Sequence, residues 1–513
     1  MTADAGRAAA RGTVLGHPRG LFVLFFAEMW ERFSYYGMRA LLIFYLTKHW
    51  LFSDGEATVV YGAYTSLVYI TPVLGGWLAD RYLGQRRAVL MGAVLLACGH
   101  LLMAVEGRGG QDDPTIAVFW AALAFIIVGS GFLKANISVI VGQLYSLTDP
   151  RRDGAYTIFY VGINLGAALG TIVAGWLGET YGWAYGFGAA GLGMLLGLLV
   201  FIWGTPLLEG RGESPDPAVL ARRVAGLRLD AWIWLAALGA VAPVWWLLQV
   251  RGLYAPLLLG GGVALLAYVL WQAARLPKEP RERIWAILFL IALQPIFWGL
   301  FEQAGGSINL FTDRYVDRQG VPASVFQSIN PVYIIILGPL FAALWTALGR
   351  RGLEPSAPAK FGLGLIQVGL SFIVLVWGAT LVGPQAMVPV IFIFLLYLLQ
   401  TTGELCLSPV GLSAMNRLAP PTMASLVMGA WFYASAGGNY VAGLIGQATG
   451  GESGEMTREG ALAVYAEVGW LAVAVGVAVL AVAPFVKRLM HLDTLADAAP
   501  VRPAPASAEG ARA

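Results

Sequence analysis

The sequence is poor in charged residues, cysteine and histidine. Asp, Glu, Lys and Arg make up 12% of its 513 residues, and 58% of the residues are hydrophobic. A soluble domain normally has about a quarter of its residues charged. Together with a mean hydropathy of +0.69, this scarcity of charge excludes an ordinary soluble domain and indicates an integral membrane protein.

The two cysteines, Cys98 and Cys406, both lie inside apolar runs, so the sequence predicts no disulfide framework and no cysteine metal site. The net charge of +3 is too small to indicate a nucleic-acid surface. No nucleophile and base occur at a spacing typical of an enzyme. We therefore expect no enzymatic activity, no cofactor, no metal and no nucleic-acid partner.

Long apolar runs fill most of the chain, each long enough for a helix of about 20 residues that crosses a bilayer. Because the runs are continuous, they favour helices over a barrel, whose strands alternate apolar and polar residues. Fourteen runs, ordered as six, two and six, predict an all-α polytopic membrane protein with two six-helix bundles and an inserted two-helix hairpin, a layout similar to the major facilitator fold. The expected segments are a basic N-terminal tail (1–19), an N-terminal bundle (20–208), a cytoplasmic linker (209–230), the hairpin (231–275), a C-terminal bundle (276–490) and a disordered tail (491–513).

Basic residues are concentrated in alternate loops. These loops contain Arg86–Arg87, Arg151–Arg152 and Arg350–Arg351, whereas the opposite loops carry acids such as Asp54 and Asp112. Cytoplasmic loops of membrane proteins are rich in Lys and Arg, so both termini are predicted to be cytoplasmic.

Within the first apolar run, the stretch Glu28–Gly37 contains three charged residues, Glu28, Glu31 and Arg32. Each costs about 2.5–3.5 kcal/mol near the centre of a membrane helix, so such residues normally face a protein interior or a water-filled path. At helical spacing, one stripe carries Arg32, Tyr35, Tyr36 and Arg39. We expect a functional site on this wall; the alternative is an ion cluster that only fixes helix packing.

Further ionisable residues at membrane depth come from both predicted bundles: Lys134 from the first, and Glu302 and Glu404 from the second. Opposite charges from different bundles would compensate each other across a central cavity. As a point charge, Lys134 suits a carboxylate ligand, and a structural ion pair is its alternative role. Neutral polar candidates are Tyr69, Asn164, Gln303 and Asn330. Candidates for side-chain pockets, which packing alone would also explain, are Phe297, Trp298, Phe301, Trp431 and Tyr433.

None of the four histidines falls in the middle of a helix expected to line the cavity. Carboxylates would then carry any coupled proton. Glu28 and Glu31 are the candidates, because burial favours the protonated form while Arg32 opposes it.

Two expectations concern the helices themselves. The inserted hairpin has no intramembrane charge, so it should not line the path. The dipeptides Asn330–Pro331 and Ser408–Pro409 are expected to break their helices, which is tolerated where a helix lines a cavity.

Four segments resemble the signatures of the proton-coupled oligopeptide transporter family within the major facilitator superfamily. They are Glu28–Gly37, Gly75–Gly84, Phe159–Gly166 and Phe297–Gln303, and the resemblance covers nearly the whole chain. It implies a symporter that imports di- and tripeptides together with protons by alternating access. The inserted hairpin resembles that of bacterial members. This resemblance implies that the protein lies in a bacterial inner membrane and is surrounded by its lipid. We expect a monomer.

The resemblance also implies roles for single residues. Arg32 and Lys134 would bind the peptide carboxylate, and its amino end would be bound by Asn164, Asn330 and Glu404. The peptide backbone would contact Tyr35, Tyr36 and Tyr69. Arg39 and Glu302 would form an extracellular gate. The chain departs from many members at Ala135, where they have proline. It departs from animal relatives at Gly62, where they have a proton-sensing histidine.

Other transport functions fit the sequence less well. Plant relatives in the same family carry nitrate or other small anions, but Arg32 and Lys134 opposed to Glu404 favour a zwitterion. A drug-efflux antiporter needs no such split site. A channel is disfavoured because mutually compensating charges suit an alternating pathway.

Overall fold

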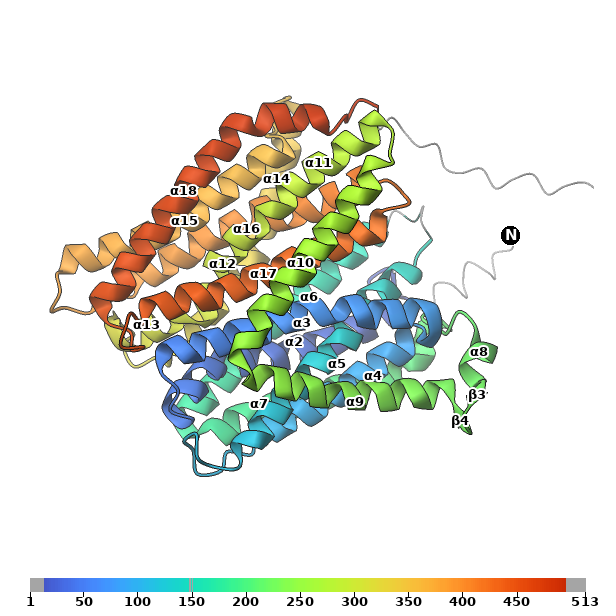
Figure 1. Cartoon of the computed structure of the whole chain (residues 1–513), viewed down its shortest axis with the longest axis horizontal. Helices are drawn as coiled ribbons and strands as arrows, with labels where there is room; N and C mark the ends of the chain where they lie inside the picture. The colour runs from blue at the N-terminus through green and yellow to red at the C-terminus, as the bar shows by residue number, and fades with distance from the viewer. Residues whose placement is uncertain (1–12, 147–148, 150, 495–513) are drawn as a thin grey trace, which may run out of the picture.

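A computed structural model describes residues 13–146, 149 and 151–494 (Figure 1). Within this part of the chain, 12 helices are long and apolar enough to cross a membrane. Two further helices of 26 residues each, α2 (Arg19–Phe44) and α17 (Ala424–Thr449), are not among the 12. The first carries several charges, and the second is rich in glycine and small polar residues. The structure is thus all-helical and multi-pass.

The first group of helices is blue to cyan in Figure 1. After α2 come α3 (Asp54–Leu78), α4 (Gln85–Met103), α5 (Ile116–Gln143), α6 (Arg152–Tyr181) and α7 (Trp183–Gly204). The π-helical turns η1 (Tyr45–His49) and η2 (Ala79–Leu83) continue α2 and α3, and the 3-10 turn η3 (Thr205–Leu208) continues α7. Glycine brings α2 and α6 together, because a Cβ on Gly37 would lie 2.9 Å from the carbonyl oxygen of Gly170.

The segment between the two groups contains α8 (Pro217–Ala221), the hairpin β3 (Arg223–Val224) and β4 (Leu227–Arg228), and two long helices, α9 (Leu229–Gln249) and α10 (Arg251–Ala274). The expected linker 209–230 therefore contains a short helix and a strand pair. Helix α9 lies against α5, where Trp245 Nε1 donates a hydrogen bond to Ala117 O (3.1 Å). Helix α10 lies against α17, where Tyr433 OH donates to Leu258 O (2.5 Å). Helix α9 thus packs on the first group, whereas α10 contacts α17 of the second group and, through Tyr254, also α3 of the first.

The second group of helices is yellow-green to red in Figure 1. It consists of α11 (Lys278–Ala292), α12 (Gln294–Phe301), the 3-10 turn η4 (Glu302–Gly305), α13 (Ser307–Tyr315), the 3-10 turn η5 (Ala323–Ser328), α14 (Ile329–Arg350), α15 (Ala357–Val382), α16 (Ile391–Leu418), α17 and α18 (Arg458–Leu489). The strand β5 (Val316–Asp317) pairs in parallel with β6 (Val388–Pro389), which ties the end of α13 to the start of α16.

Small residues let the two groups approach each other along α3 and α17. A Cβ on Gly62 would lie 2.8 Å from Gly443 Cα, so only glycine fits at this crossing. Nearby, Ser66 Oγ donates a hydrogen bond to Ala436 O (2.6 Å). A second contact joins α6 to η5, where Glu179 accepts hydrogen bonds from the backbone N–H groups of η5.

Of the two proline pairs expected to break a backbone hydrogen-bond ladder, Pro409 removes one hydrogen bond inside α16 and Pro331 removes none, and the helix interruption lies elsewhere. Pro331 lies in the first turn of α14, where its missing N–H costs no helical hydrogen bond, and Pro409 lies inside the continuous helix α16. The predicted run 284–311 is instead divided into α11, α12, η4 and α13. Pro295 and the pair Gly305–Gly306 stand at the interruptions, where a residue without an N–H or without a Cβ is tolerated.

Both predicted tails are partly ordered. Thr13–Val14 pairs with His17–Pro18, and helix α2 already begins at Arg19. At the other end Arg283 Nη2 of α11 donates to Thr494 Oγ1 (2.7 Å), so residues 491–494 do not belong to a disordered tail. Residues 1–12 and 495–513 lie outside the described part of the chain.

Candidate functional site

A cavity of about 130 Å³ lies between the two groups of helices. Its walls include α2, α3 and α6 from the first group and α12, η4, η5, α14 and α16 from the second. The predicted candidate residues that line it are Tyr36, Arg39, Tyr69, Asn164, Trp298, Phe301, Glu302, Asn330 and Glu404. Side chains far apart in the sequence therefore meet on one polar surface.

One end of the cavity is closed by an ion pair between the two groups. Arg39 Nη1 of α2 lies 3.0 Å from Glu302 Oε2 of η4, and the two side chains are 8% and 3% exposed. The interruption after α12 places Glu302 at this point, where its carboxylate faces the arginine. Removing one partner of a buried pair costs about 3–5 kcal/mol, because the other charge is left without compensation.

Further contacts join the groups at the same end. Arg314 of α13 makes two hydrogen bonds to the Asp54 carboxylate at the start of α3, of 2.5 and 2.7 Å. Lys48 Nζ lies 2.6 Å from Asp313 Oδ2. At the opposite ends of the helices, the described residues form no ion pair between the two groups. The structure is therefore closed at the end predicted to be extracellular.

Arg32 is held by both predicted proton carriers. Its Nε lies 2.7 Å from Glu28 Oε1 and 3.0 Å from Glu31 Oε2, and all three side chains are buried. None of the three lines the cavity. In this conformation the Arg32 guanidinium contacts two carboxylates of its own helix, those of Glu28 and Glu31.

Lys134 lies behind an aromatic side chain of the cavity wall. Its Nζ is 3.7 Å from the centre of the Tyr69 ring and 5.7 Å from that of Tyr35. Within the described residues Lys134 has no carboxylate within ion-pair distance, and it does not line the cavity. A cation over a tyrosine ring is stabilised by about 0.5–2 kcal/mol, which is weaker than a buried ion pair. Lys134 is thus held loosely.

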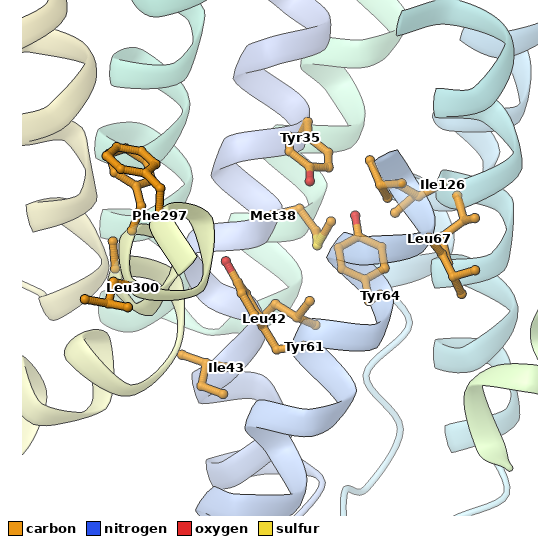
Figure 2. Packing of buried hydrophobic residues seen from close by; sticks show 14 of the residues in the cluster. Tyr35, Met38, Leu42, Ile43, Tyr61, Tyr64, Leu67, Ile126, Phe297 and Leu300 are labelled. Carbon is orange, nitrogen blue, oxygen red and sulfur yellow. The ribbon is translucent and has the colours of Figure 1, made fainter. Parts of the chain in front are cut away.

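Tyr35 also lies away from the cavity. It is 1% exposed and belongs to the apolar core around α2 and α3, together with Tyr61 and Tyr64 (Figure 2). Trp431 likewise does not line the cavity and packs edge-to-face on Phe361. Tyr35 and Trp431, which were expected to contact a ligand, therefore do not line the cavity in this conformation.

The cavity wall formed by the second helix group carries the Glu404 carboxylate, which has few hydrogen-bond partners. Asn330 Nδ2 donates to Glu404 Oε2 (3.1 Å) and to Thr401 Oγ1 (3.0 Å). Asn164 of α6 also lines the cavity: its Nδ2 donates to Tyr160 O (3.0 Å), and its amide oxygen accepts no hydrogen bond from the described residues. This wall is suited to a cationic group.

The comparisons with known proteins agree with this arrangement. The family model described as PTR2, POT family, matches residues 86–458. The chain belongs to the POT family. It is 36% identical over 494 residues to an uncharacterized transporter YclF of Bacillus subtilis, covering 93% of this chain and 95% of that protein. It is 38% identical over 457 residues to the peptide transporter YePEPT of Yersinia enterocolitica, covering 85% and 88%.

Solved structures of the POT family share the fold. A crystal structure of a mutant of the peptide transporter POT in complex with alafosfalin is 35% identical and has a TM-score of 0.81. The match covers 96% of this chain and 100% of that one. This POT family member is therefore a membrane transporter, and its relatives are transporters rather than enzymes.

Sequence reasoning missed several residues of the POT cavity. These are Tyr160, Ile163, Ala167, Thr171, Ala304, Gln327, Ile334 and Tyr397. Tyr160 precedes Asn164 by one helical turn, so the 3.6-residue period could have found it. The same spacing argument could have found Tyr397, seven residues before Glu404, and Gln327, three residues before Asn330.

Proposed function

We propose that this POT family member is a proton-coupled symporter that imports di- and tripeptides by alternating access. The observation that carries the proposal is the polar cavity between the two helix groups, closed at one end by Arg39 and Glu302. A transported solute needs a site that both groups share, since relative movement of the groups can then expose it to either side. The names of the Yersinia relative and of the solved transporter indicate peptides as the solute.

The charges of the cavity support one orientation of the peptide. Its amino end would lie at Glu404, Asn330 and Asn164 on one side of the cavity. Its carboxylate would point toward Lys134 and Arg32. The peptide backbone and side chains between the two ends would contact Tyr36, Tyr69 and Trp298. For the carboxylate to reach Lys134, the Tyr69 ring must move aside, because it covers the ammonium group in this conformation.

Charge balance supports Glu31 as the residue that couples the proton. Glu28, Glu31, Arg32 and Lys134 together carry two negative and two positive charges. A proton on Glu31 leaves the cluster with one uncompensated positive charge, and a peptide carboxylate restores the balance. Protonation of Glu31 also removes a negative charge that lies 3.0 Å from Arg32 Nε, which makes the guanidinium more available to a peptide carboxylate. Proton and peptide would therefore favour each other's binding.

The same proposal includes a topology of fourteen membrane helices: the 12 apolar ones together with α2 and α17. Helices α9 and α10 would form the inserted hairpin between two six-helix bundles. Basic loops place both termini in the cytoplasm of a bacterium, with the protein as a monomer in the inner membrane.

Uptake into proteoliposomes tests the function directly. A labelled dipeptide should accumulate when an inward proton gradient is imposed and should only equilibrate without one. For one proton and a neutral peptide, about 100 mV and one pH unit supply about 2.3 and 1.4 kcal/mol, which allows accumulation of about 500-fold. Uptake that ignores both an uncoupler and the external pH would exclude proton coupling.

A further inference from the structure

A second cavity, of about 440 Å³, lies at the end of the second helix group that we expect in the cytoplasm. It is enclosed by α14, α15, α16 and α18, away from the transport cavity. Its basic lining residues are Lys360, Arg417 and Lys487, and the only acidic one among the described residues is Glu354. The lining of this cavity therefore has an excess of positive charge, which attracts an anion.

One of the three cations is built into the wall. Lys360 is only 7% exposed, forms an ion pair with Glu354, and holds its Nζ 4.2 Å from the centre of the Trp345 ring. The carboxylate of Glu354 thus already has Lys360 as its ion-pair partner. Arg417 and Lys487 are exposed, and neither forms an ion pair in the described part of the chain. Two positive charges facing this cavity are left without a partner.

The start of α15 adds a further positive element. Ser356 and Ala357 line the cavity, and Ser356 precedes this 26-residue helix without donating or accepting a side-chain capping hydrogen bond. The helix dipole and the free N–H groups of a first helical turn, which here lacks that of Pro358, both favour an anion. The Ser356 hydroxyl is available as a further donor.

The rest of the cavity is apolar. Ala414 and Met490 line it, and Trp345 is of the type that is enriched at membrane interfaces. On the same ends of α14 and α18, Leu344 and Phe485 are 44% and 64% exposed, as expected for side chains against lipid tails. A free phosphate would gain nothing from these apolar surfaces, whereas a lipid carries acyl chains beside its phosphate.

We propose that this cavity binds the phosphate group of an anionic phospholipid from the cytoplasmic leaflet. The phosphate lies between Arg417 and Lys487, near the start of α15, and the glycerol and upper acyl chains contact Trp345 and the apolar wall. Basic pockets between membrane helices on this side are suited to such headgroups. The site is independent of the peptide-binding cavity and of the proposed function.

Native mass spectrometry of the full chain in detergent tests the site. Phosphatidylglycerol, phosphatidylcholine and inorganic phosphate are titrated separately against the wild type, the double variant Arg417→Gln/Lys487→Gln, and a control, Arg222→Gln/Arg223→Gln. The control removes the same charge from exposed residues that lie outside the cavity.

The wild type and the control should bind one phosphatidylglycerol at least tenfold more tightly than phosphatidylcholine, and the Arg417/Lys487 variant should lose this preference. Thermal unfolding of the variant without lipid should match the wild type, which shows that it folds. Equal phosphatidylglycerol binding by all three proteins would overturn the site. Binding of inorganic phosphate alone with the same dependence on Arg417 and Lys487 would overturn the lipid assignment.

Discussion

Arg32 shares its guanidinium between two carboxylates of its own helix, and this arrangement decides how a proton can act. Arg32 Nε donates a hydrogen bond to Glu28, and a charged hydrogen bond of this kind contributes about 1.5–3 kcal/mol. Glu31 lies 3.0 Å from the same atom as an ion-pair partner, so neutralising Glu31 loosens the arginine without leaving it unpaired. Glu28 keeps its 2.7 Å contact with Arg32 when Glu31 is neutral. The two carboxylates thus have different roles: one fixes the arginine, and the other switches it.

The first prediction concerns Glu31→Gln. Glutamine cannot release a proton, so gradient-driven accumulation should fall at least tenfold, while peptide exchange between equal concentrations on both sides continues. Counterflow and gradient-driven uptake, measured on the same proteoliposomes, separate the two activities. Glu452→Gln, in an exposed loop, is the matched control and should behave as wild type. Normal accumulation by Glu31→Gln would remove this residue from the coupling mechanism.

The second prediction concerns the orientation of the peptide. Each capped end of a peptide loses a charged interaction, which should weaken binding about tenfold or more. C-terminal amidation should lose most of its penalty in Lys134→Ala, and N-acetylation should lose its penalty in Glu404→Gln, because the partner is already gone. Competition assays with both capped peptides measure this. If each cap costs the same in all three proteins, the assigned orientation is wrong.

At the scale of elements, the pair α9 and α10 supports the helix groups without entering the cavity. None of its described residues lines the peptide cavity. Tyr254 OH of α10 donates to Ser66 Oγ of α3 (2.5 Å), and Ser66 in turn donates to Ala436 O of α17. Helix α10 therefore contributes to the crossing of α3 and α17, where both groups meet.

The third prediction follows for Tyr254→Phe. Loss of the buried hydrogen bond to Ser66 should lower stability by about 1 kcal/mol, while the apparent peptide affinity stays within twofold of wild type. Thermal unfolding and competition binding on the purified protein measure the two effects. Tyr268→Phe, on an exposed turn of the same helix, should change neither. A large loss of affinity in folded Tyr254→Phe would place the hairpin in the transport path.

At the scale of the whole molecule, the contacts between the groups are distributed unequally between the two ends. Arg39–Glu302, Arg314–Asp54 and Lys48–Asp313 all lie at the end predicted to be extracellular. To open the cavity to the extracellular side, these contacts must break together, since they join the same two bodies. Arg39–Glu302 is the one that also lines the cavity, so occupancy of the cavity can act on it directly.

The fourth prediction is that Glu302→Gln opens the closed end. Arg39 is then buried without compensation, which costs about 3–5 kcal/mol in the closed conformation. Spin labels at residues 181 and 319, placed in a variant whose exposed Cys98 is replaced, should show a longer distance than in the parent. Glu302→Asp keeps the charge and should stay largely closed. An unchanged distance in Glu302→Gln would show that the other two ion pairs hold this end without Arg39–Glu302.

The sequence was sufficient for much of the site. The 3.6-residue period correctly placed Tyr36 and Arg39 on one wall, and membrane depth singled out Glu302 and Glu404, all of which line the cavity. Periodicity could not place Tyr35 or Trp431, because a helix face shared by several aromatic residues does not show which of them meets the core. It also could not show that Tyr69 covers Lys134, since the two belong to different helices.

The sequence by itself determined that the chain enters a membrane, where its apolar runs lie and which charges are buried with them, because insertion depends on local hydrophobicity and length. Composition and periodicity did not determine the partners of those charges: only the family resemblance implied the pair Arg39–Glu302, and the tertiary structure decided how the charges meet. Arg39 meets Glu302 across 263 residues, and the chain is interrupted between α12 and α13 rather than at Pro331 or Pro409. Both follow from how the two helix groups pack, because a buried charge requires a partner, and the backbone is interrupted where that partner is placed.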